Sequence, residues 1–381
     1  MKVAIVYDRV NKWGGAEKVL LNFHKIFPEA PLYCAVYDPD KAPWASVFPK
    51  VIPSFLNKIP FAKNNHELLG FITPIAFEMF NFDSYDLVIS VTSESAKGII
   101  TKPSTLHICY CLTPTRYLWS GYDEYLSNPP KKLSWIPFYK IISKPLLNYA
   151  KKWDLVASSR PDYYVAISTA VKNRIKKYYG RDSEIIYPPV ETDKFKRQKS
   201  KVKITNHNSK IEKLRMGDFF LIVSRLVPYK KVDLAIEGLI KLGKNLIVVG
   251  TGSEEEKYKT KYKSNKNIIF KGFVTDDELA MYYRNAKAFI YPQEEDFGIT
   301  AVEAQAAGIP VIAYKKGGVL DTIIDGKTGI LFNNQSIKSL SGAVLKLEKM
   351  KFEKDEIVAN SAKFSEEKFE KEILDLMKLN V

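Results

Sequence analysis

The sequence contains few of the residues that build disulfide cross-links, metal sites or membrane spans. Its 381 residues include three cysteines, Cys34, Cys109 and Cys111, an odd number without the spacing of metal ligands. We therefore expect reduced cysteines, buried in strands of a cytosolic protein, because disulfides are rare in that compartment. No apolar run reaches the roughly 18 residues that a membrane-spanning helix needs. Lys2 leads directly into an apolar strand pattern, so no signal peptide is expected.

Negative charge is also scarce relative to positive charge. Lysine and arginine number 58 against 43 aspartates and glutamates, which gives a formal net charge of +15 spread over both halves of the chain. Such an excess suits an anionic substrate or an anionic membrane surface. Nucleic acid is not expected as a partner, because no nucleic-acid-binding motif stands out.

Short apolar runs alternate with amphipathic segments along the whole chain, which predicts α/β domains. The length leaves room for two domains of ordinary size, which we place at 1–192 and 193–364, followed by a helix at 365–381. The basic, aperiodic run 194–215 is interpreted as a linker or surface insertion. Strands are expected at 3–7, 32–36, 87–90, 106–112, 163–168, 219–224, 246–250, 267–273, 286–291 and 311–314.

The most informative stretch is 287–308, where an apolar strand is followed by an acidic loop and an alanine-rich helix. Glu295 then lies beyond the carboxyl end of a strand, where open α/β sheets bind ligands. Gly298 lets a backbone approach a ligand closely, and the helix after it offers N–H groups to an anion. This arrangement would suit a nucleotide-sugar. Glu295 could bind its sugar hydroxyls, the amides its diphosphate and Glu303 its ribose hydroxyls. The alternative is an acidic loop and a solvated helix face.

A glycine pair follows the first predicted strand. Gly14 and Gly15 lie between that strand and an amphipathic helix from about residue 16 to residue 27. This strand, turn and helix arrangement cradles phosphate in many α/β domains. A glycine pair by itself marks only a turn in most sequences.

Several ordered motifs resemble the signature of the family 4 retaining glycosyltransferases. The resemblance implies the GT-B fold, two Rossmann-like domains facing across a cleft, and transfer of a sugar from a nucleotide-sugar. It covers nearly the whole chain. The motifs are Glu295-x7-Glu303 with Phe297-Gly298 inside it, Gly308-Ile-Pro-Val-Ile-Ala, Gly317-Gly318 and Asp325-Gly326-x-x-Gly329.

The same resemblance implies roles for individual residues. Arg225 and Lys230 match an Arg-x4-Lys loop and would act with Glu295 in catalysis, because two cations can neutralise a leaving nucleotide diphosphate. Arg116 and Tyr117 would lie on the acceptor side. No metal and no cofactor are expected, since the nucleotide-sugar is a substrate. The donor-binding residues would be Gly14, Gly15, Phe273, Val274, Phe297, Gly298, Ile299, Thr300 and Glu303.

The segment 113–119, Thr-Pro-Thr-Arg-Tyr-Leu-Trp, resembles a stretch of mannosyltransferases from surface-polysaccharide pathways. The histidine that precedes this stretch in relatives and contacts the donor sugar is replaced by Leu112. His107 is five positions earlier, on the other face of a strand, and is expected to be structural. The resemblance favours GDP-mannose as donor. A UDP-sugar donor and a non-catalytic sugar-binding scaffold remain as alternatives.

Lysines and aromatic residues are interleaved over 128–153. A basic, aromatic amphipathic segment can lie on an anionic membrane surface. The alternative is a helix packed on the N-terminal domain with its lysines in water. The expected acceptor is a glycan or lipid-linked glycan, and the expected location is cytoplasmic, with peripheral attachment to the inner face of the cell membrane.

Overall fold

The computed structural model describes residues 1–60, 63, 69–127, 138–196 and 219–380. The chain divides into two compact units, one formed by residues 1–187 and 370–381 and the other by residues 188–369. Most of the predicted linker at 194–215 lies outside the described residues. The domain boundaries proposed at 192 and 364 stay predictions.

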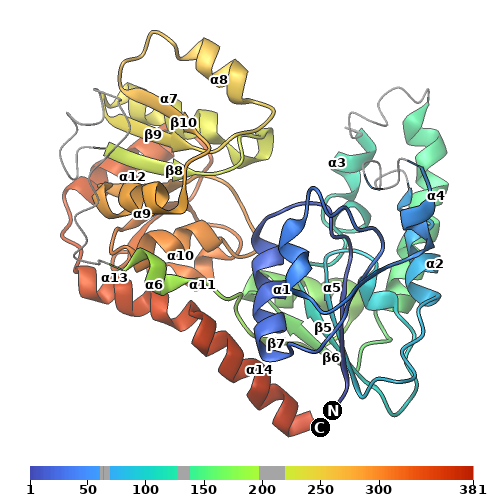
Figure 1. Ribbon diagram of the computed structural model, residues 1–381. Coiled ribbons are helices and arrows are strands. Elements are labelled where there is room, and N and C mark those ends of the chain that lie inside the picture. Colours follow the sequence, from blue (N-terminus) through green and yellow to red (C-terminus); the bar gives the residue numbers. More distant parts are fainter. Residues whose placement is uncertain (61–62, 64–68, 128–137, 197–218, 381) are drawn as a thin grey trace. The chain divides into compact units, whose positions relative to one another are not determined.

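In the first unit, seven of the described strands form one parallel sheet in the order β3-β2-β1-β4-β5-β6-β7 (Figure 1). The strand order reverses between β1 and β4, where Val3 pairs with Leu87 and Tyr7 with Val91. The strands are β1 Val3–Tyr7, β2 Leu32–Cys34, β3 Val51–Pro53, β4 Leu87–Thr92, β5 Leu106–Cys111, β6 Tyr163–Ala166 and β7 Glu184–Ile185. The α-helices are α1 Gly15–Ile26, α2 Thr73–Glu78, α3 Tyr122–Ser127, α4 Tyr139–Ala157 and α5 Thr169–Tyr179.

In the second unit, six of the described strands form a parallel sheet in the order β10-β9-β8-β11-β12-β13. The order reverses between β8 and β11, which pair through Ala288 and Phe220. The strands are β8 Phe219–Val223, β9 Asn245–Val249, β10 Ile268–Gly272, β11 Ala288–Tyr291, β12 Val311–Tyr314 and β13 Gly329–Phe332. The α-helices are α6 Thr192–Phe195, α7 Val232–Lys241, α8 Glu255–Lys261, α9 Asp276–Asn285, α10 Ile299–Ala306, α11 Val319–Thr322, α12 Ile337–Glu348 and α13 Lys354–Ser361, and α14 Glu366–Asn380 follows.

Successive residues of the second sheet face two different helix layers. Phe220 and Ile222 of β8 belong to a buried cluster that includes residues of α7, α8 and α12. Phe219 and Leu221 belong to a second cluster that includes residues of α9 and α10. Because side chains alternate along a strand, a strand buried on both faces appears in the sequence as a continuous apolar run. This explains why the runs at 219–224 and 246–250 identify strands correctly.

All ten sequence-predicted strands are present, with small differences at their ends. The strands predicted at 3–7 and 311–314 are confirmed as β1 and β12. The strand predicted at 32–36 ends at Cys34, because the backbone N–H of Ala35 instead bonds the carbonyl of Asp8, at 3.2 Å. The sequence did not indicate β3 or β13, which are only three and four residues long.

The three cysteines are free and buried, as predicted, with Cys34 in β2 and the other two in β5. Burial raises the pKa of the Cys34 thiol, which keeps it protonated and unreactive at neutral pH. Among the described residues, no helix is both long enough and apolar enough to cross a membrane.

Candidate functional site

The sequence-selected residues of the second unit follow the two strands between which the sheet order reverses. Arg225 and Lys230 come after β8, and residues 295–298 come after β11. In open parallel sheets, the loops at the carboxyl ends of these two strands diverge and leave a crevice for a ligand. The topology therefore brings the predicted residues to the place where such a sheet binds a nucleotide.

Two of the predicted catalytic side chains are bonded to each other. The Lys230 ammonium donates to the Glu295 carboxylate, and the two side chains are 14% and 23% exposed. The Lys230 ammonium also lies 5.3 Å from the centre of the Tyr229 ring. Arg225 is exposed, and its guanidinium donates to the Tyr229 hydroxyl at 2.7 Å. Tyr229 thus contacts both cations, which the sequence did not suggest.

The loop that carries Glu295 is held by the predicted glycine pair. Gly318 donates its backbone N–H to the Glu295 carbonyl at 2.8 Å. A Cβ at Gly317 would lie 2.2 Å from that carbonyl oxygen, and a Cβ at Gly318 would lie 2.3 Å from the Cα of Phe297. Only glycine therefore allows the two loops to approach this closely. Gly298 precedes α10 with a φ of 101°, in the left-handed region that other residues rarely adopt.

Glu303 lies on α10 but is buried, with only 3% of the residue exposed. Its carboxylate accepts a hydrogen bond of 3.0 Å from the hydroxyl of Tyr283 on α9. Burial and this carboxylate raise the pKa of Tyr283 well above its usual value, so the phenol remains a donor. The alternative of a solvated helix face is thus wrong for Glu303. A buried carboxylate with a fixed donor is typical of a binding site or a structural anchor.

The other donor-side residues differ in exposure. Phe273 follows β10 and is 88% exposed, whereas Val274 packs against the core of the unit. Phe297 is buried, and its ring centre lies 5.6 Å from that of Phe364. A ligand would therefore contact Phe297 through the backbone rather than through the ring. Ile299 and Thr300 are half-buried in the first turn of α10.

In the first unit, charged residues gather where the sheet order reverses between β1 and β4. The buried carboxylate of Asp8 accepts backbone N–H groups from Ser93 and Glu94, at 2.8 and 3.0 Å. The next residue, Arg9, forms an ion pair of 2.7 Å with Glu94. Burial acts to lower the pKa of Arg9, but the Glu94 carboxylate raises it through Coulomb attraction and a hydrogen bond. The net effect is a raised pKa. The sequence analysis missed these residues, although Asp8 and Arg9 directly follow the first predicted strand.

The predicted glycine pair lies beyond the same strand. Gly14 caps the amino end of α1, and Gly15 is the first residue of that helix. The arrangement of strand, glycine turn and helix is as predicted.

The predicted acceptor-side residues lie in the loop after β5. Leu112 is half-buried directly after the strand, Arg116 is exposed, and Tyr117 is half-buried in a 3-10 turn. The Tyr117 ring packs against Tyr125 of α3, with ring centres 5.3 Å apart. Arg116 is therefore the member of this loop that a ligand can reach most readily.

A buried ion pair is hydrogen-bonded to two residues of this loop. Asp154 of α4 accepts a hydrogen bond of 2.5 Å from the Lys97 ammonium, and both side chains are almost fully buried. The same carboxylate accepts from the Thr115 hydroxyl at 2.8 Å and from the Trp119 indole N–H at 2.7 Å. The Tyr179 hydroxyl donates to it at 2.8 Å. Nothing in the sequence indicated this network, because its members come from four separate segments.

His107 has the structural role expected for it. It is fully buried in β5, and its Nε2 lies 2.8 Å from the hydroxyl of Ser90 on the neighbouring strand. Burial, aided by the charge of Arg160, lowers the pKa of His107 to about 3. The imidazole is therefore neutral at physiological pH.

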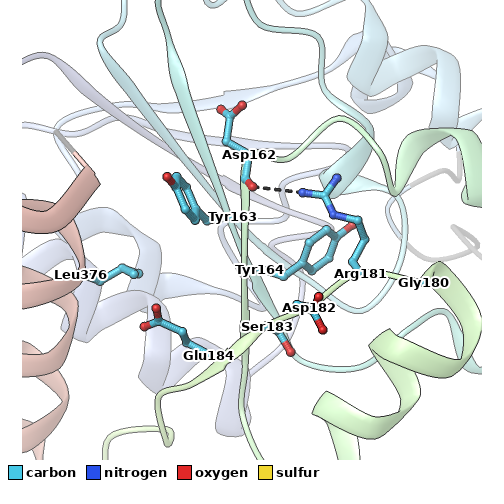
Figure 2. A pocket seen from close by; sticks show the side chains of 9 residues that line it. All are labelled: Asp162, Tyr163, Tyr164, Gly180, Arg181, Asp182, Ser183, Glu184 and Leu376. Carbon is cyan, nitrogen blue, oxygen red and sulfur yellow. Dashed lines mark hydrogen bonds between the residues drawn. The ribbon is translucent and has the colours of Figure 1, made fainter.

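The first unit also contains a cavity of about 460 Å³ away from these loops (Figure 2). Tyr163 begins β6 and Glu184 begins β7, so the cavity lies at the amino ends of these strands. Arg181 is fixed at its wall by a hydrogen bond of 3.0 Å to the carbonyl of Asp162. The cavity is therefore distinct from the crevice at the carboxyl ends. Its lining residues are Asp162, Tyr163, Tyr164, Gly180, Arg181, Asp182, Ser183, Glu184 and Leu376.

A family model matches much of the second unit. Residues 203–364 match the model described as "Glycosyl transferases group 1". Through these residues the second unit is similar to the group 1 glycosyl transferases. Among the described residues, no group of three or more His, Cys, Asp and Glu side chains is arranged to hold a metal ion.

Curated proteins similar to this chain include mannosyltransferases. The chain is 28% identical over 202 residues to "Alpha-1,3/1,6-mannosyltransferase ALG2" of Dictyostelium discoideum, covering 45% of this chain and 48% of that protein. It is 28% identical over 207 residues to a "GDP-mannose-dependent alpha-(1-6)-phosphatidylinositol monomannoside mannosyltransferase" of Mycobacterium tuberculosis, covering 49% and 52%. The chain spans about half the length of these curated relatives.

Solved structures share the fold over the full chain. The crystal structure of Anabaena Alr3699/HepE in complex with UDP matches with a TM-score of 0.70 and 18% identity, covering 99% of this chain and 100% of that one. The predicted fold class is thereby confirmed: the chain has two parallel α/β units and the GT-B fold.

Proposed function

We propose that this chain is a retaining, metal-independent hexosyltransferase that moves mannose from GDP-mannose to a glycan or lipid-linked glycan during cell-surface polysaccharide synthesis. The observation that carries the proposal is the bonded pair of Lys230 and Glu295 at the point where the second sheet reverses its strand order. The mannosyltransferases among the relatives support mannose as the transferred sugar.

The first task of such an enzyme is to stabilise the departing nucleotide diphosphate. An ammonium group has three N–H donors, and Glu295 takes one from Lys230. The others can bond the β-phosphate, and Arg225 adds a second cation beside it. Negative charge on this phosphate grows as the bond to the sugar breaks, so these cations bind the transition state more tightly than the ground state.

The remaining residues would bind the donor and orient the acceptor. The exposed ring of Phe273 suits stacking on the base, and Glu303 suits the ribose hydroxyls. The Gly298 backbone, with Ile299 and Thr300, offers amide groups to the diphosphate. No residue is assigned as a nucleophile. Retention would then follow from departure and attack on the same face of the sugar, with the phosphate accepting the acceptor proton.

In the first unit, Gly14 and Gly15 would approach the diphosphate, while Arg116 and Tyr117 would contact the acceptor. A cytoplasmic enzyme working peripherally at the inner face of the cell membrane would meet a lipid-linked acceptor there.

Two observations favour alternatives. The related fold of Anabaena Alr3699/HepE was solved with UDP, which supports a UDP-sugar donor as the second candidate. Leu112 provides neither a hydrogen bond nor a proton, which supports a scaffold that binds donor without transferring it. A thermal-shift comparison of GDP-mannose with UDP-glucose separates the donors, because a ligand at 100 times its Kd stabilises the native state by about 2.7 kcal/mol.

The catalytic assignment is tested by Lys230→Met in a sugar-transfer assay, with Lys231→Met as the matched control. Lys231 is exposed and adjacent, so its replacement removes the same charge without touching the Glu295 pair. We expect kcat to fall by about 10²-fold for Lys230→Met, with a smaller change in donor KM. The control should retain activity. A Lys230→Met enzyme with wild-type kcat and only a raised KM would remove Lys230 from the catalytic machinery.

A further inference from the structure

The cavity at the amino ends of β6 and β7 is lined by polar groups that lack protein partners. Ser183 is only 9% exposed, yet its hydroxyl has no hydrogen-bond partner among the described residues. Burying a hydroxyl without a partner destabilises a protein, so a native structure that keeps one calls for an explanation. Glu184, the next residue, is exposed, and its carboxylate has no partner among the described residues either. A ligand in the cavity could bond both groups.

The Arg181 guanidinium is fixed in the wall of this cavity and still has donors to offer. It donates to the carbonyls of Ser159, Pro161 and Asp162, at 3.2, 2.7 and 3.0 Å. It also lies 5.4 Å from the centre of the Tyr164 ring. A guanidinium has five N–H groups, so these three bonds leave two for a ligand. Because the group is already held in place, it loses little freedom when a ligand binds.

Another part of the cavity wall is aromatic and apolar. Tyr163 of β6 is 41% exposed, and Leu376 of α14 also lines the cavity (Figure 2). Val165 pairs with Glu184, so Tyr163, two residues earlier on β6, projects from the same face of the sheet as Glu184. Leu376 belongs to the same unit, which includes residues 370–381. The cavity thus combines an exposed ring and a carboxylate on one face of the sheet.

The charges of the wall narrow the chemistry of the ligand. Asp162 already accepts a backbone N–H at 2.8 Å, and Asp182 forms an ion pair with a lysine. Glu184 and Arg181, one charge of each sign, remain available to a ligand. They favour a neutral ligand that both donates and accepts hydrogen bonds over a ligand with charge of a single sign. A sugar has such hydroxyl groups, and the apolar face of its ring suits an exposed tyrosine.

We propose that this cavity is a second ligand site of the first unit, which binds one or two neutral sugar residues of a glycan. The sugar ring stacks on Tyr163, and its hydroxyls donate to Glu184 and accept from Arg181. Ser183 thereby gains the partner that it lacks. The volume of about 460 Å³ lies within the range of about 300–1,000 Å³ that is usual for small-ligand sites.

This site is separate from the predicted acceptor loop. The cavity lies at the amino ends of β6 and β7, whereas the loop follows the carboxyl end of β5. The length of a strand separates them, so one sugar residue cannot occupy both. A longer glycan held in the cavity would be an acceptor or a product only if the proposed function holds, whereas the binding itself does not rest on it.

A printed array of neutral, anionic and aminated oligosaccharides, probed with the labelled full chain and without donor, tests the binding. We expect retention on neutral oligosaccharides. Tyr163→Ala should weaken the affinity for the best-retained oligosaccharide by about tenfold in calorimetry, and Tyr163→Phe should keep most of it, because the ring remains. The matched control is Tyr149→Ala on α4, since Tyr149 is also exposed and does not line the cavity.

Ser183→Ala separates ligand binding from a structural role. The substitution removes a buried hydroxyl without a partner, so the urea midpoint should stay unchanged or rise slightly. The same substitution should weaken oligosaccharide binding by about fivefold, because the bound sugar loses one hydrogen bond. A serine with a structural role would give the reverse result, a lower midpoint with unchanged binding.

Three results on the array would overturn the proposal. The first is that no neutral oligosaccharide retains the protein. The second is retention that Arg116→Ala abolishes and Tyr163→Ala leaves unchanged, since the glycan would then occupy the acceptor loop. The third is preferred retention on aminated or anionic oligosaccharides that falls as salt rises, since a charge would then be recognised. Sugar transfer takes no part in this assay, so failure of the site and failure of the proposed function are distinguishable.

Discussion

Asp154→Ala is the substitution whose effect follows most directly from the structure. The Asp154 carboxylate accepts hydrogen bonds from Lys97, Thr115, Trp119 and Tyr179, all within 2.8 Å. Removing it leaves the Lys97 ammonium in a position where only 2% of the side chain is exposed. The ammonium still donates to the Glu94 carbonyl at 2.5 Å and to the Thr115 hydroxyl at 3.3 Å, but it has lost the opposite charge. Its desolvation is therefore only partly compensated.

The expected loss is large for a single substitution. Removing one partner of a buried ion pair costs about 3–5 kcal/mol, because the other charge stays buried. Replacing both charges is predicted to be far milder, since apolar residues of similar volume often replace a buried pair at little net cost. Lys97→Met should therefore restore much of the stability that Asp154→Ala removes.

Urea unfolding followed by tryptophan fluorescence measures this loss in the first unit specifically. A protein of two units need not unfold in one step, so the probe must report on one of them. All five tryptophans lie in the range 1–187, at positions 13, 44, 119, 135 and 153. Asp182→Ala is the matched control, because Asp182 forms an exposed ion pair with Lys176 and its loss should leave the midpoint unchanged. If Asp154→Ala costs less than about 1 kcal/mol, as an exposed pair would, the reasoning about the buried charge is refuted.

Three further predictions concern single residues. Glu303→Ala should weaken nucleotide diphosphate binding by about 1.5–3 kcal/mol, and an unchanged Kd by calorimetry would remove Glu303 from the site. Leu112→His should change turnover by about tenfold or less, near 1.4 kcal/mol, in a labelled-sugar transfer assay; if wild type binds donor but only the variant transfers it, the protein is a scaffold. The His107 pKa is lowered to about 3, so below pH 6.5 the unfolded chain takes up a proton that the native state does not. This proton uptake should lower the free energy of unfolding by about 2 kcal/mol between pH 7 and pH 5. The urea midpoint of His107→Gln should fall less than that of the wild type over the same pH range.

The sequence pattern was sufficient to predict strands and glycine turns, because these depend on residues that are close together in the chain. The segments that became β1, β8 and β12 are buried on both faces, so they appear in the sequence as continuous apolar runs. Gly317 and Gly318 were recognised as part of a motif, and the structure shows that their missing Cβ atoms allow a close approach to the Glu295 loop. The short strands β3 and β13 carry no comparable signal.

The sequence could not predict the burial and the bonding partners of individual side chains, because these depend on residues that are far apart in the chain. Glu303 was expected on a helix after a strand, yet its burial and its bond to Tyr283 arise from the packing of α9 against α10. Phe297 matched a binding motif, and packing turned its ring into the core beside Phe364.

The sequence by itself determined the alternation of strands and helices, the resemblance to a family, and the identity of the cations and carboxylates at the strand ends, because these are properties of short consecutive segments. Only the tertiary structure decided that Lys230 bonds Glu295 across 65 residues of chain, and that Asp154 joins Lys97, Thr115 and Tyr179. It also decided that α4 exposes several apolar side chains while it buries Leu147 and Asp154. Burial and pairing are set by which segments meet when the sheets form, and the spacing of residues along the chain does not contain that information.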